Sequence, residues 1–373
     1  NRKKGMIEMK SKCVVLEEKE KINIKEVEVP ELKEGLLIKV YACGVCGTDP
    51  HVYAGRFKAT QYPSVLGHEL YGEIIEISKN CDVECINGKM KVGDVVALVP
   101  GKSCGVCPYC KELPEEEQIC PHRTTYGLNV PMDKYPVLGG GYSEYAIILN
   151  GFKVYKVNKD WKFGYGTLLE PVAVTTKAVE KGLKNAEKTL NRELNIVIQG
   201  AGTIGLFIAI QLKNMGYNPY IIDIRKNRIE TAKKLGINRA ILMENIETTI
   251  NNIQSESMGL GADLVYECAG TLEAFNQSKE LVRRGGTIIE MGNFADTGET
   301  SISPSVICRS EHKYVGSVLA TAKYYKLAEE VLDSVKEHYE DIICPIYSLE
   351  EAQNAIDNVA NIKQGLKTII KCN

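Results

Sequence analysis

The sequence predicts an α/β protein whose central part is a doubly wound sheet of parallel strands. A short apolar segment, "LNIVIQ" at 194–199, leads into a glycine turn and an amphipathic helix, and a second apolar segment, "PYIID", follows at 219–223. The segments "GADLVYECAG", "LEAFNQSKELVRRGG" and "TIIEMGNF" continue the alternation of strand, helix and strand that such a sheet requires. We place this domain at 166–317.

The glycine turn has the spacing G-x-G-x-x-G and lies between a predicted strand and a predicted helix. Gly200 permits the tight turn, Gly202 lets a pyrophosphate approach the backbone at the helix N-terminus, and Gly205 lets the helix pack closely on the strand. Thr203 and Ile204 complete this cofactor-binding turn. The central domain is therefore predicted to be a Rossmann domain that binds a dinucleotide.

The acidic residue at the end of the second strand indicates which dinucleotide binds. Asp223 lies where a carboxylate accepts hydrogen bonds from the ribose hydroxyls of NAD and repels a 2′-phosphate. Arg225 and Arg228 follow it, and a basic residue at this place can hold the 2′-phosphate of NADP. Because a phosphate beside a carboxylate would be repelled, we expect NAD rather than NADP, with Arg228 beside the nucleotide.

Bulk composition excludes several classes of function. The chain has 373 residues, a net charge of -2, 44% hydrophobic and 25% charged residues. This charge argues against nucleic acid as a partner, and the apolar runs are shorter than the roughly 20 residues of a membrane span. The basic start "NRKKGMIEMK" lacks the apolar core of a signal peptide, so we expect a cytoplasmic protein.

A cluster of four cysteines in "CGVCPYCKELPEEEQIC" predicts a closed metal site. Three of them have C-x2-C-x2-C spacing and the fourth follows nine residues later. This pattern favours a structural zinc ion held by Cys104, Cys107, Cys110 and Cys120. An iron–sulfur cluster is the alternative, although its usual last gap is three residues, and a disulfide would leave two cysteines unexplained. Five other cysteines in apolar surroundings are expected to be buried: Cys13, Cys268, Cys308, Cys344 and Cys372.

A second set of ligand-type residues predicts an open site where chemistry can occur. Cys46 lies in "GVCGTDPHV", His68 and Glu69 lie in "VLGHELYGEII", and Glu170 lies in "LLEPVAV". One cysteine, one histidine and a carboxylate match the zinc centres that leave a position for water or substrate. Asp49 could orient His68 by accepting the hydrogen of its second ring nitrogen, or it could be a turn residue.

The order of these motifs resembles that of the zinc-containing medium-chain dehydrogenase/reductases along nearly the whole chain. The shared motifs are "GVCGTDPH", "GHELYGEI", "VGDVV", the cysteine cluster, "GGYSEY", "EPVAV", "GAGTIG" and Asp223. The resemblance implies a GroES-like, β-rich catalytic domain formed by 1–165 and completed by 318–373. The Rossmann domain is inserted between these two parts, with the active site in the cleft.

The resemblance also implies a role for each site residue. Cys46 and His68 would be ligands of a catalytic zinc, with Glu170 as the third ligand and Glu69 as an alternate. Thr48 and His51 would pass the substrate proton toward solvent. The four clustered cysteines would hold a structural zinc ion, although "KELPEEEQI" is two residues longer than the common spacing. The expected cofactors are thus two zinc ions and NAD.

The implied reaction is hydride transfer between NAD(H) and a secondary alcohol or ketone. Ethanol-type members carry cysteine where this chain has Glu170, which points to a polyol, a cyclitol or a sugar derivative. L-threonine is the alternative substrate, because "CGTDPHVY" resembles the threonine dehydrogenase stretch that ends in Tyr53, whereas sorbitol-type members carry the tyrosine at position 52. A zinc-free reductase and a non-catalytic NAD-binding protein are further alternatives. We expect a homodimer or homotetramer.

Overall fold

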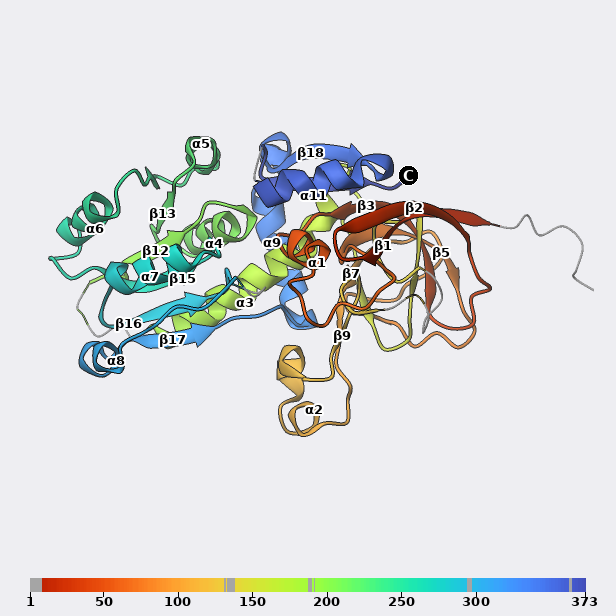
Figure 1. Cartoon of the computed structure of the whole chain (residues 1–373), viewed down its shortest axis with the longest axis horizontal. Helices are drawn as coiled ribbons and strands as arrows, with labels where there is room; N and C mark the ends of the chain where they lie inside the picture. Colours follow the sequence, from red (N-terminus) through yellow and green to blue (C-terminus); the bar gives the residue numbers. More distant parts are fainter. Residues whose placement is uncertain are drawn as a thin grey trace, which may run out of the picture. The chain divides into compact units, whose positions relative to one another are not determined.

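The computed structural model describes residues 9–130, 132, 138–186, 190, 192–293, 297–361 and 364–373. The chain forms two compact units (Figure 1). The first unit comprises Asn1–Glu170, Thr321–Lys326 and Tyr339–Asn373, and the second comprises Pro171–Ala320 and Leu327–His338. Among the described residues, no helix has both the length and the hydrophobicity needed to cross a membrane.

The first unit is rich in β-structure, as predicted. A three-stranded sheet has the order β2-β1-β4, an eight-stranded sheet has the order β18-β19-β3-β5-β7-β11-β6 with β10 paired to β3, and β8 pairs with β9. The strands are β1 (Lys10–Glu18), β2 (Lys21–Glu28), β3 (Leu36–Gly44), β4 (Ser64–Val65), β5 (Glu69–Ile77), β6 (Glu84–Cys85), β7 (Val95–Val99), β8 (Gly101–Lys102), β9 (Thr124–Thr125), β10 (Tyr145–Ile148), β11 (Lys153–Lys156), β18 (Ile343–Ser348) and β19 (Lys367–Lys371).

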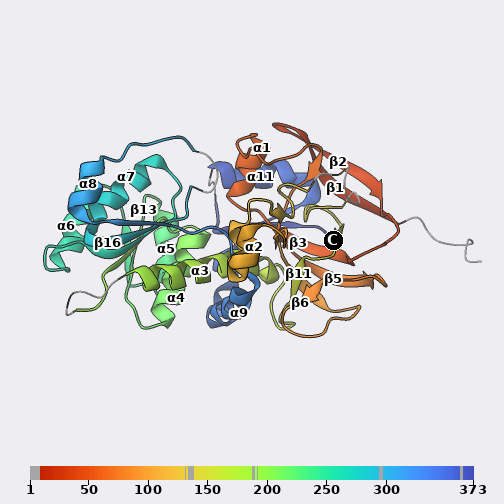
Figure 2. The same ribbon diagram turned by 90° about the horizontal axis from the view of Figure 1, so that it is seen from below.

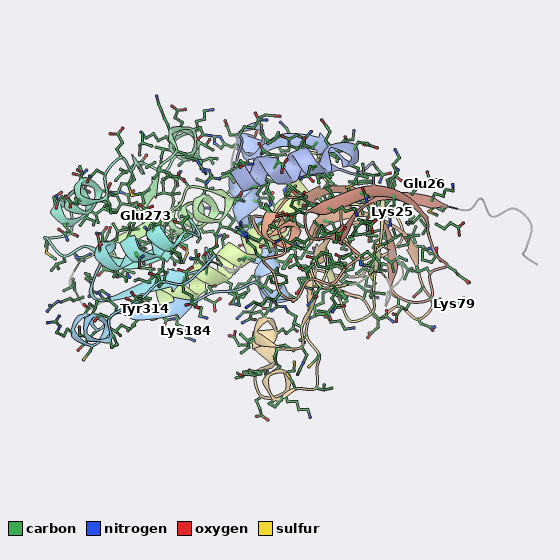
Figure 3. The ribbon with its side chains drawn as sticks, in the orientation of Figure 1. Lys25, Glu26, Lys79, Lys184, Glu273 and Tyr314 are labelled. Carbon is green, nitrogen blue, oxygen red and sulfur yellow. The ribbon has the colours of Figure 1, made fainter. Side chains whose placement is uncertain are left out.

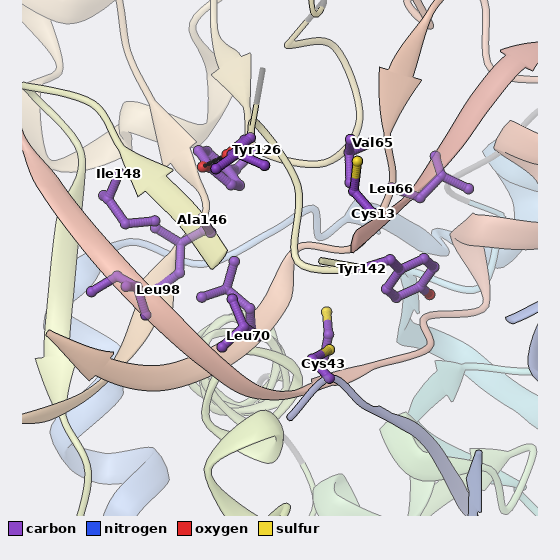
Figure 4. Packing of buried hydrophobic residues seen from close by; sticks show 14 of the residues in the cluster. Cys13, Cys43, Val65, Leu66, Leu70, Leu98, Tyr126, Tyr142, Ala146 and Ile148 are labelled. Carbon is purple, nitrogen blue, oxygen red and sulfur yellow. Dashed lines mark hydrogen bonds between the residues drawn. The ribbon is translucent and has the colours of Figure 1, made fainter. Parts of the chain in front are cut away.

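Short helices connect the strands of this unit. They are α1 (Thr48–Tyr53), α2 (Pro108–Glu112), η1 (Pro114–Ile119), η2 (Tyr165–Leu168), η3 (Ala322–Tyr324), α10 (Tyr339–Ile342), η5 (Leu349–Glu351) and α11 (Ala352–Asn361). A buried core joins residues from β1, β3, β5, β10 and α11 (Figure 4). The outer strand β2 instead carries exposed charged residues such as Lys25 and Glu26 (Figure 3).

The second unit is the predicted doubly wound sheet. Six parallel strands have the order β14-β13-β12-β15-β16-β17, so the strand order reverses between β12 and β15. Ligands of such sheets bind beyond the carboxyl ends of the strands at this reversal. The strands are β12 (Ile196–Gln199), β13 (Tyr220–Asp223), β14 (Arg239–Leu242), β15 (Ala262–Glu267), β16 (Val282–Glu290) and β17 (Lys313–Gly316).

Helices precede, connect and follow the strands of this sheet (Figure 2). They are α3 (Leu169–Asn185), which begins at the end of the first unit, α4 (Thr203–Asn214), α5 (Lys226–Lys234), α6 (Ile246–Ser255), α7 (Leu272–Leu281), α8 (Pro304–Ser310), α9 (Tyr325–Ser334) and η4 (Lys336–His338). The prediction that α4 is amphipathic was wrong, because every residue from 205 to 212 is buried. The helix packs on β12 and β13, and its polar residue Gln211 donates to the Thr175 hydroxyl over 2.6 Å.

The expectation of buried free cysteines holds for only part of the set. Cys13 and Cys372 are buried, and Cys268 is partly buried. Cys308 and Cys344 are exposed. Cys308 lies on the surface helix α8, which has no buried residue, and Cys344 lies on β18, an edge strand of its sheet. Their apolar sequence neighbours do not decide which side of the element each thiol occupies.

Candidate metal centres and nucleotide site

Two adjacent strands of the first unit bring three ligand-type residues together. Cys46 follows the end of β3, and His68 and Glu69 stand at the start of the antiparallel strand β5. Gly44 is the cross-strand partner of Glu69, and a side chain at Gly44 would collide with the Glu69 carboxylate. The ligand atoms of Cys46, His68 and Glu69 all lie within 4.8 Å of one another.

Glu170 lies beside this group in the first turn of α3. It is buried, and burial raises the pKa of its carboxyl to about 7, against the opposing effect of His68. The nearby charge of Glu69 raises the pKa further. The structure thus gathers Glu69 with Cys46 and His68 and places Glu170 within electrostatic reach of them.

A buried lysine that sequence reasoning missed neutralises Glu69. The Lys367 ammonium on β19 forms an ion pair with the Glu69 carboxylate and donates to the Val45 carbonyl over 3.2 Å. Burial disfavours the charged amine, but the charges of Glu69, Cys46 and Asp49 together outweigh burial and raise the pKa of Lys367. The sequence signal was a lysine that begins the apolar segment "KTII", where an unpaired charge is costly.

The environment of His68 combines burial with negative charge. Burial disfavours its imidazolium, whereas the charges of Cys46, Asp49 and Glu170 favour it and raise the pKa of His68 to about 10. Its Nδ1 lies 3.8 Å from Oδ1 of Asp49. Oδ2 of Asp49 accepts a hydrogen bond of 2.8 Å from the Cys46 amide. Asp49 thus links the two sequence segments that supply Cys46 and His68.

The two predicted relay residues both lie on α1. The Thr48 hydroxyl is 3.5 Å from the Cys46 sulfur, which places it beside the group. His51 is three residues further on the same helix, and burial lowers the pKa of its imidazole, as does the charge of Arg56. The structure records no side-chain hydrogen bond between Thr48 and His51 among its described residues. The Tyr53 hydroxyl donates instead to the Glu20 carbonyl over 2.9 Å.

The residues of this group fit zinc. A thiol, an imidazole and a carboxylate are the donor types of catalytic zinc centres, which keep a further position for water or substrate. Asp49 Oδ1 and His68 Nδ1 are buried without a hydrogen-bond partner among the described residues, and they face each other. With Nδ1 turned toward a carboxylate, the other ring nitrogen is the one left for a metal, as is usual for histidine ligands.

The four clustered cysteines converge between β8 and β9, around α2 and η1. Sulfur to sulfur distances are 3.9 Å for Cys104 and Cys110, 3.5 Å for Cys107 and Cys110, and 3.9 Å for Cys107 and Cys120. Four sulfurs placed tetrahedrally at about 2.3 Å from zinc would be about 3.8 Å apart. The long segment before Cys120 folds into η1 and still delivers the fourth sulfur, so the set fits a closed zinc site.

Local groups act differently on two thiols of this cluster. The Cys110 amide lowers the pKa of Cys107, but burial and the hydrogen bonds of the other three thiols together raise it to about 11. At Cys104 the balance favours the thiolate. The amides of Val106 and Cys107 donate to the Cys104 sulfur and lower the pKa of that thiol to about 6. Arg123, which sequence reasoning missed, lies beside Cys120 and is held by the Thr125 hydroxyl over 3.1 Å. Its positive charge offsets part of the negative charge that four thiolates bring to one ion.

The glycine turn has the backbone geometry that its spacing predicts. Gly200 has a φ of 93°, in the left-handed region that favours glycine. Gly202 is the N-cap of α4. A side chain at Gly205 would lie 1.9 Å from the Gly200 carbonyl oxygen, so only glycine lets the helix approach the turn. Thr203 and Ile204 form the first turn of α4, where amides point at a bound anion.

Asp223 ends β13 and braces the glycine turn. Its Oδ2 accepts a hydrogen bond of 2.7 Å from the Ala201 amide, and its Oδ1 accepts one of 2.8 Å from the Arg225 amide. Arg228 lies 3.6 Å from Asp223 and beside Gly202, and burial lowers the pKa of its guanidinium. Asp223 is therefore paired with Arg228 and hydrogen-bonded to the glycine turn at the same time.

Comparison with known proteins gives matches over most of the chain. Residues 33–159 match the family model described as alcohol dehydrogenase GroES-like domain, and residues 163–371 match that described as glucose dehydrogenase C-terminus. D-arabitol-phosphate dehydrogenase of Enterococcus avium is 29% identical, covering 93% of both chains. Sorbitol dehydrogenase of Bacillus subtilis is 29% identical over 94% of both. A solved alcohol dehydrogenase of Thermotoga maritima has a TM-score of 0.87 at 25% identity, covering 98% of this chain and 100% of its own.

Proposed function

Because the chain is a dehydrogenase of the zinc-type medium-chain alcohol dehydrogenase superfamily, we propose that it oxidises a secondary alcohol of a polyol, cyclitol or sugar derivative with NAD. The observation that carries this proposal is the convergence of Cys46, His68 and Glu69 in a group of three ligand-type residues, to which the described part of the chain adds no fourth within the same distance. The four-cysteine cluster is closed, so the proposal assigns the chemistry to the three-residue group.

The residues of the first group would hold the metal and handle the substrate proton. Zinc bound there would act as a Lewis acid on the substrate oxygen. Cys46 and His68 would be ligands, with a carboxylate from Glu69 or Glu170. The Thr48 hydroxyl, beside Cys46, would accept a hydrogen bond from the substrate hydroxyl. His51 would take the proton onward, since its lowered pKa leaves the imidazole neutral near pH 7.

We propose NAD rather than NADP as the cofactor. Asp223 places a buried carboxylate at the end of β13, next to the glycine turn. A 2′-phosphate at this place would meet that carboxylate, whereas ribose hydroxyls can donate to it. Arg228 is already paired with Asp223 in the described structure, so its charge is partly engaged before any nucleotide binds.

Polyols are the proposed substrate class on two grounds. Two similar proteins are named for D-arabitol phosphate and sorbitol, which are polyols or their phosphates. In addition, the carboxylates of Asp49 and Glu170 lie near His68, and that of Glu69 belongs to the same group, so the surroundings of the proposed metal site are polar rather than apolar. A site that hydrogen-bonds extra hydroxyls leaves its polar groups unpaired when a simple alcohol binds.

One experiment tests both parts of the proposal. Initial rates would be followed by NADH or NADPH absorbance for linear polyols, cyclitols, sugars, sugar phosphates, L-threonine, 2-propanol and ethanol, each with NAD and with NADP. We expect kcat/KM to be highest for a vicinal hydroxy compound with NAD and at least about 100-fold lower for ethanol. A higher kcat/KM for primary alcohols than for every polyol would refute the substrate class. A preference for NADP would refute the cofactor assignment.

A further inference from the structure

We propose that Tyr142 is a positioning residue of the three-residue metal centre, which it serves by holding Asp49 in the orientation that fixes the His68 ring. The inference rests on the proposed function, because it assumes that Cys46 and His68 bind zinc. It assigns a role to a residue that touches neither the metal ligands' donor atoms nor the expected substrate. The role would be to keep the centre's geometry and to retain its ion.

The hydrogen bonds around Asp49 leave one oxygen for His68. The Tyr142 hydroxyl donates to Asp49 Oδ2 over 2.6 Å, and the Cys46 amide donates to the same oxygen over 2.8 Å. Oδ1 has no hydrogen-bond partner among the described residues and lies 3.8 Å from Nδ1 of His68. Two donors on Oδ2 therefore set the rotation of the carboxylate and point Oδ1 at the histidine.

Burial makes these hydrogen bonds important. Asp49 and Tyr142 are fully buried, and His68 is 4% exposed, so water cannot replace a lost donor. A buried carboxylate without donors is unfavourable, so removing one of its two donors disturbs the position of the carboxylate. Tyr142 thus supplies one of the two donors that fix this buried carboxylate opposite His68.

The ring of Tyr142 is itself fixed next to the ligand segment. The Tyr142 amide donates to the Leu66 carbonyl over 2.9 Å, and its carbonyl accepts from the Val14 amide over 2.8 Å. A side chain at Gly67 would lie 2.6 Å from the tyrosine ring, so the ring packs against the residue before His68. A phenylalanine would keep this packing and remove only the hydroxyl, which makes Tyr142→Phe a specific test.

Tyr126 supplies a matched control in the same core (Figure 4). It is also a fully buried tyrosine, and its hydroxyl donates to the Leu138 carbonyl over 2.7 Å and to the Ile147 carbonyl. Neither partner belongs to a metal group. Tyr126→Phe therefore removes a buried tyrosine hydroxyl, as Tyr142→Phe does, but leaves the hydrogen bonds of Asp49 unchanged.

The experiment measures retention of zinc rather than activity. Wild type, Tyr142→Phe and Tyr126→Phe, all loaded with zinc, would be mixed with a chelator and a colorimetric zinc indicator to follow release of the labile ion. We expect zinc release to be about tenfold faster in Tyr142→Phe than in wild type, which is the lower end of the effect of losing a hydrogen-bond partner of a metal-bound histidine. Release from Tyr126→Phe should be within about twofold of wild type. After cobalt(II) replaces the labile zinc, the visible spectrum of Tyr142→Phe should differ from that of wild type, whereas the spectrum of Tyr126→Phe should match it.

A coupling test addresses the route through Asp49. If Tyr142 acts through this carboxylate, Asp49→Asn and the double variant Asp49→Asn/Tyr142→Phe should release zinc at the same rate, because the second change has nothing left to disturb. Equal release from Tyr142→Phe and Tyr126→Phe, or additive effects in the double variant, would overturn the inference while leaving the proposed function intact. A wild-type protein without a chelator-labile zinc would overturn both.

Discussion

Individual charged residues in the first unit are paired although they are buried. Glu69 has Lys367, Asp49 has Tyr142 and the Cys46 amide, and the imidazole of His68 faces Asp49. A buried charge without such partners would cost several kcal/mol, so the partners are part of the site. His51 differs, because it is only partly buried and the neighbouring charge that acts on it is the like charge of Arg56 rather than a carboxylate.

We expect protonation of His51 to lower kcat/KM for alcohol oxidation at acid pH. Its pKa is lowered by burial and by Arg56, so the imidazole is neutral above a pKa that lies below 6.5 and becomes charged as the pH falls through that value. A charged imidazole cannot accept a proton. We expect kcat/KM of wild type to fall with decreasing pH in this range, and His51→Gln to be about tenfold slower at pH 7 without this fall.

His312→Gln is the control for this profile. His312 is another partly buried histidine whose pKa is lowered by burial, but it lies on the second unit next to β17. Its replacement should leave the pH profile of kcat/KM unchanged. An acid limb that persists in His51→Gln would show that another group accepts the proton.

At the scale of elements, the register of two strands brings two carboxyl groups together. β15 and β16 are parallel neighbours, and Glu267 at the end of the first is the partner of Glu290 at the end of the second. The Asn293 amide donates to Glu290 over 3.1 Å and to Glu267 over 3.4 Å. Burial, followed by the charge of Glu290, raises the pKa of Glu267 to about 8. Glu267 therefore retains its proton near neutral pH.

This proton should make the folded protein less stable as the pH rises. The folded state binds a proton more tightly than the unfolded chain, so its advantage is complete below the unfolded pKa of about 4.3 and is lost as the pH rises through about 8. Glu267→Gln should mimic the protonated carboxyl, because its amide can donate to Glu290. We expect its free energy of unfolding, relative to wild type, to rise by more than about 1 kcal/mol between pH 5 and 8.

Urea denaturation at several pH values would measure this difference. Glu280→Gln on α7 is the control, because Glu280 is exposed and lies outside the strand pair. Its effect should not change with pH. Parallel curves for wild type and Glu267→Gln across this range would contradict a proton held by Glu267.

At the scale of the whole molecule, the described residues include two separate ligand sets in one compact unit. The group of Cys46, His68 and Glu69 offers three ligands and would leave one position of a tetrahedral zinc free, whereas the four-cysteine cluster offers four and would fill every position. An open site exchanges its ion faster than a closed one. The two sets should therefore differ in how readily they lose zinc and in what their loss does to the protein.

We expect purified protein to contain about two zinc ions per chain, of which a chelator removes one quickly. Cys46→Ser should retain one ion and the fold but lose at least about 1,000-fold in kcat/KM, because the substrate-facing ion is lost. Cys107→Ser should lose the other ion and several degrees of thermal stability. Plasma emission spectrometry and calorimetry measure these outcomes.

Cys81→Ser provides the reference for replacing a cysteine. Cys81 is a partly buried free cysteine outside both ligand sets, so its variant should keep two ions and normal activity. Full activity in Cys46→Ser would exclude that residue as a ligand of the catalytic ion. A metal count of one in wild type would mean that only one of the two sets binds zinc.

Local spacing in the sequence was sufficient to predict several features. The parallel sheet was predicted from the glycine motif, the acid at position 223 and the alternation of apolar and amphipathic segments. Each of these signals lies in residues that are close together in the sequence. The four clustered cysteines predicted their convergence for the same reason, and the longer segment before Cys120 did not prevent it. These features require only short-range geometry.

Contacts between distant segments could be decided only by the tertiary structure. The pairing of Lys367 with Glu69 joins residues almost 300 positions apart, and Tyr142 reaches Asp49 across 93 positions. The same applies to the gathering of Glu69, rather than Glu170, with Cys46 and His68. A charged residue in an apolar segment indicates that a partner is needed. Strand order and register determine which residue that partner is, and no local pattern in the sequence contains this information.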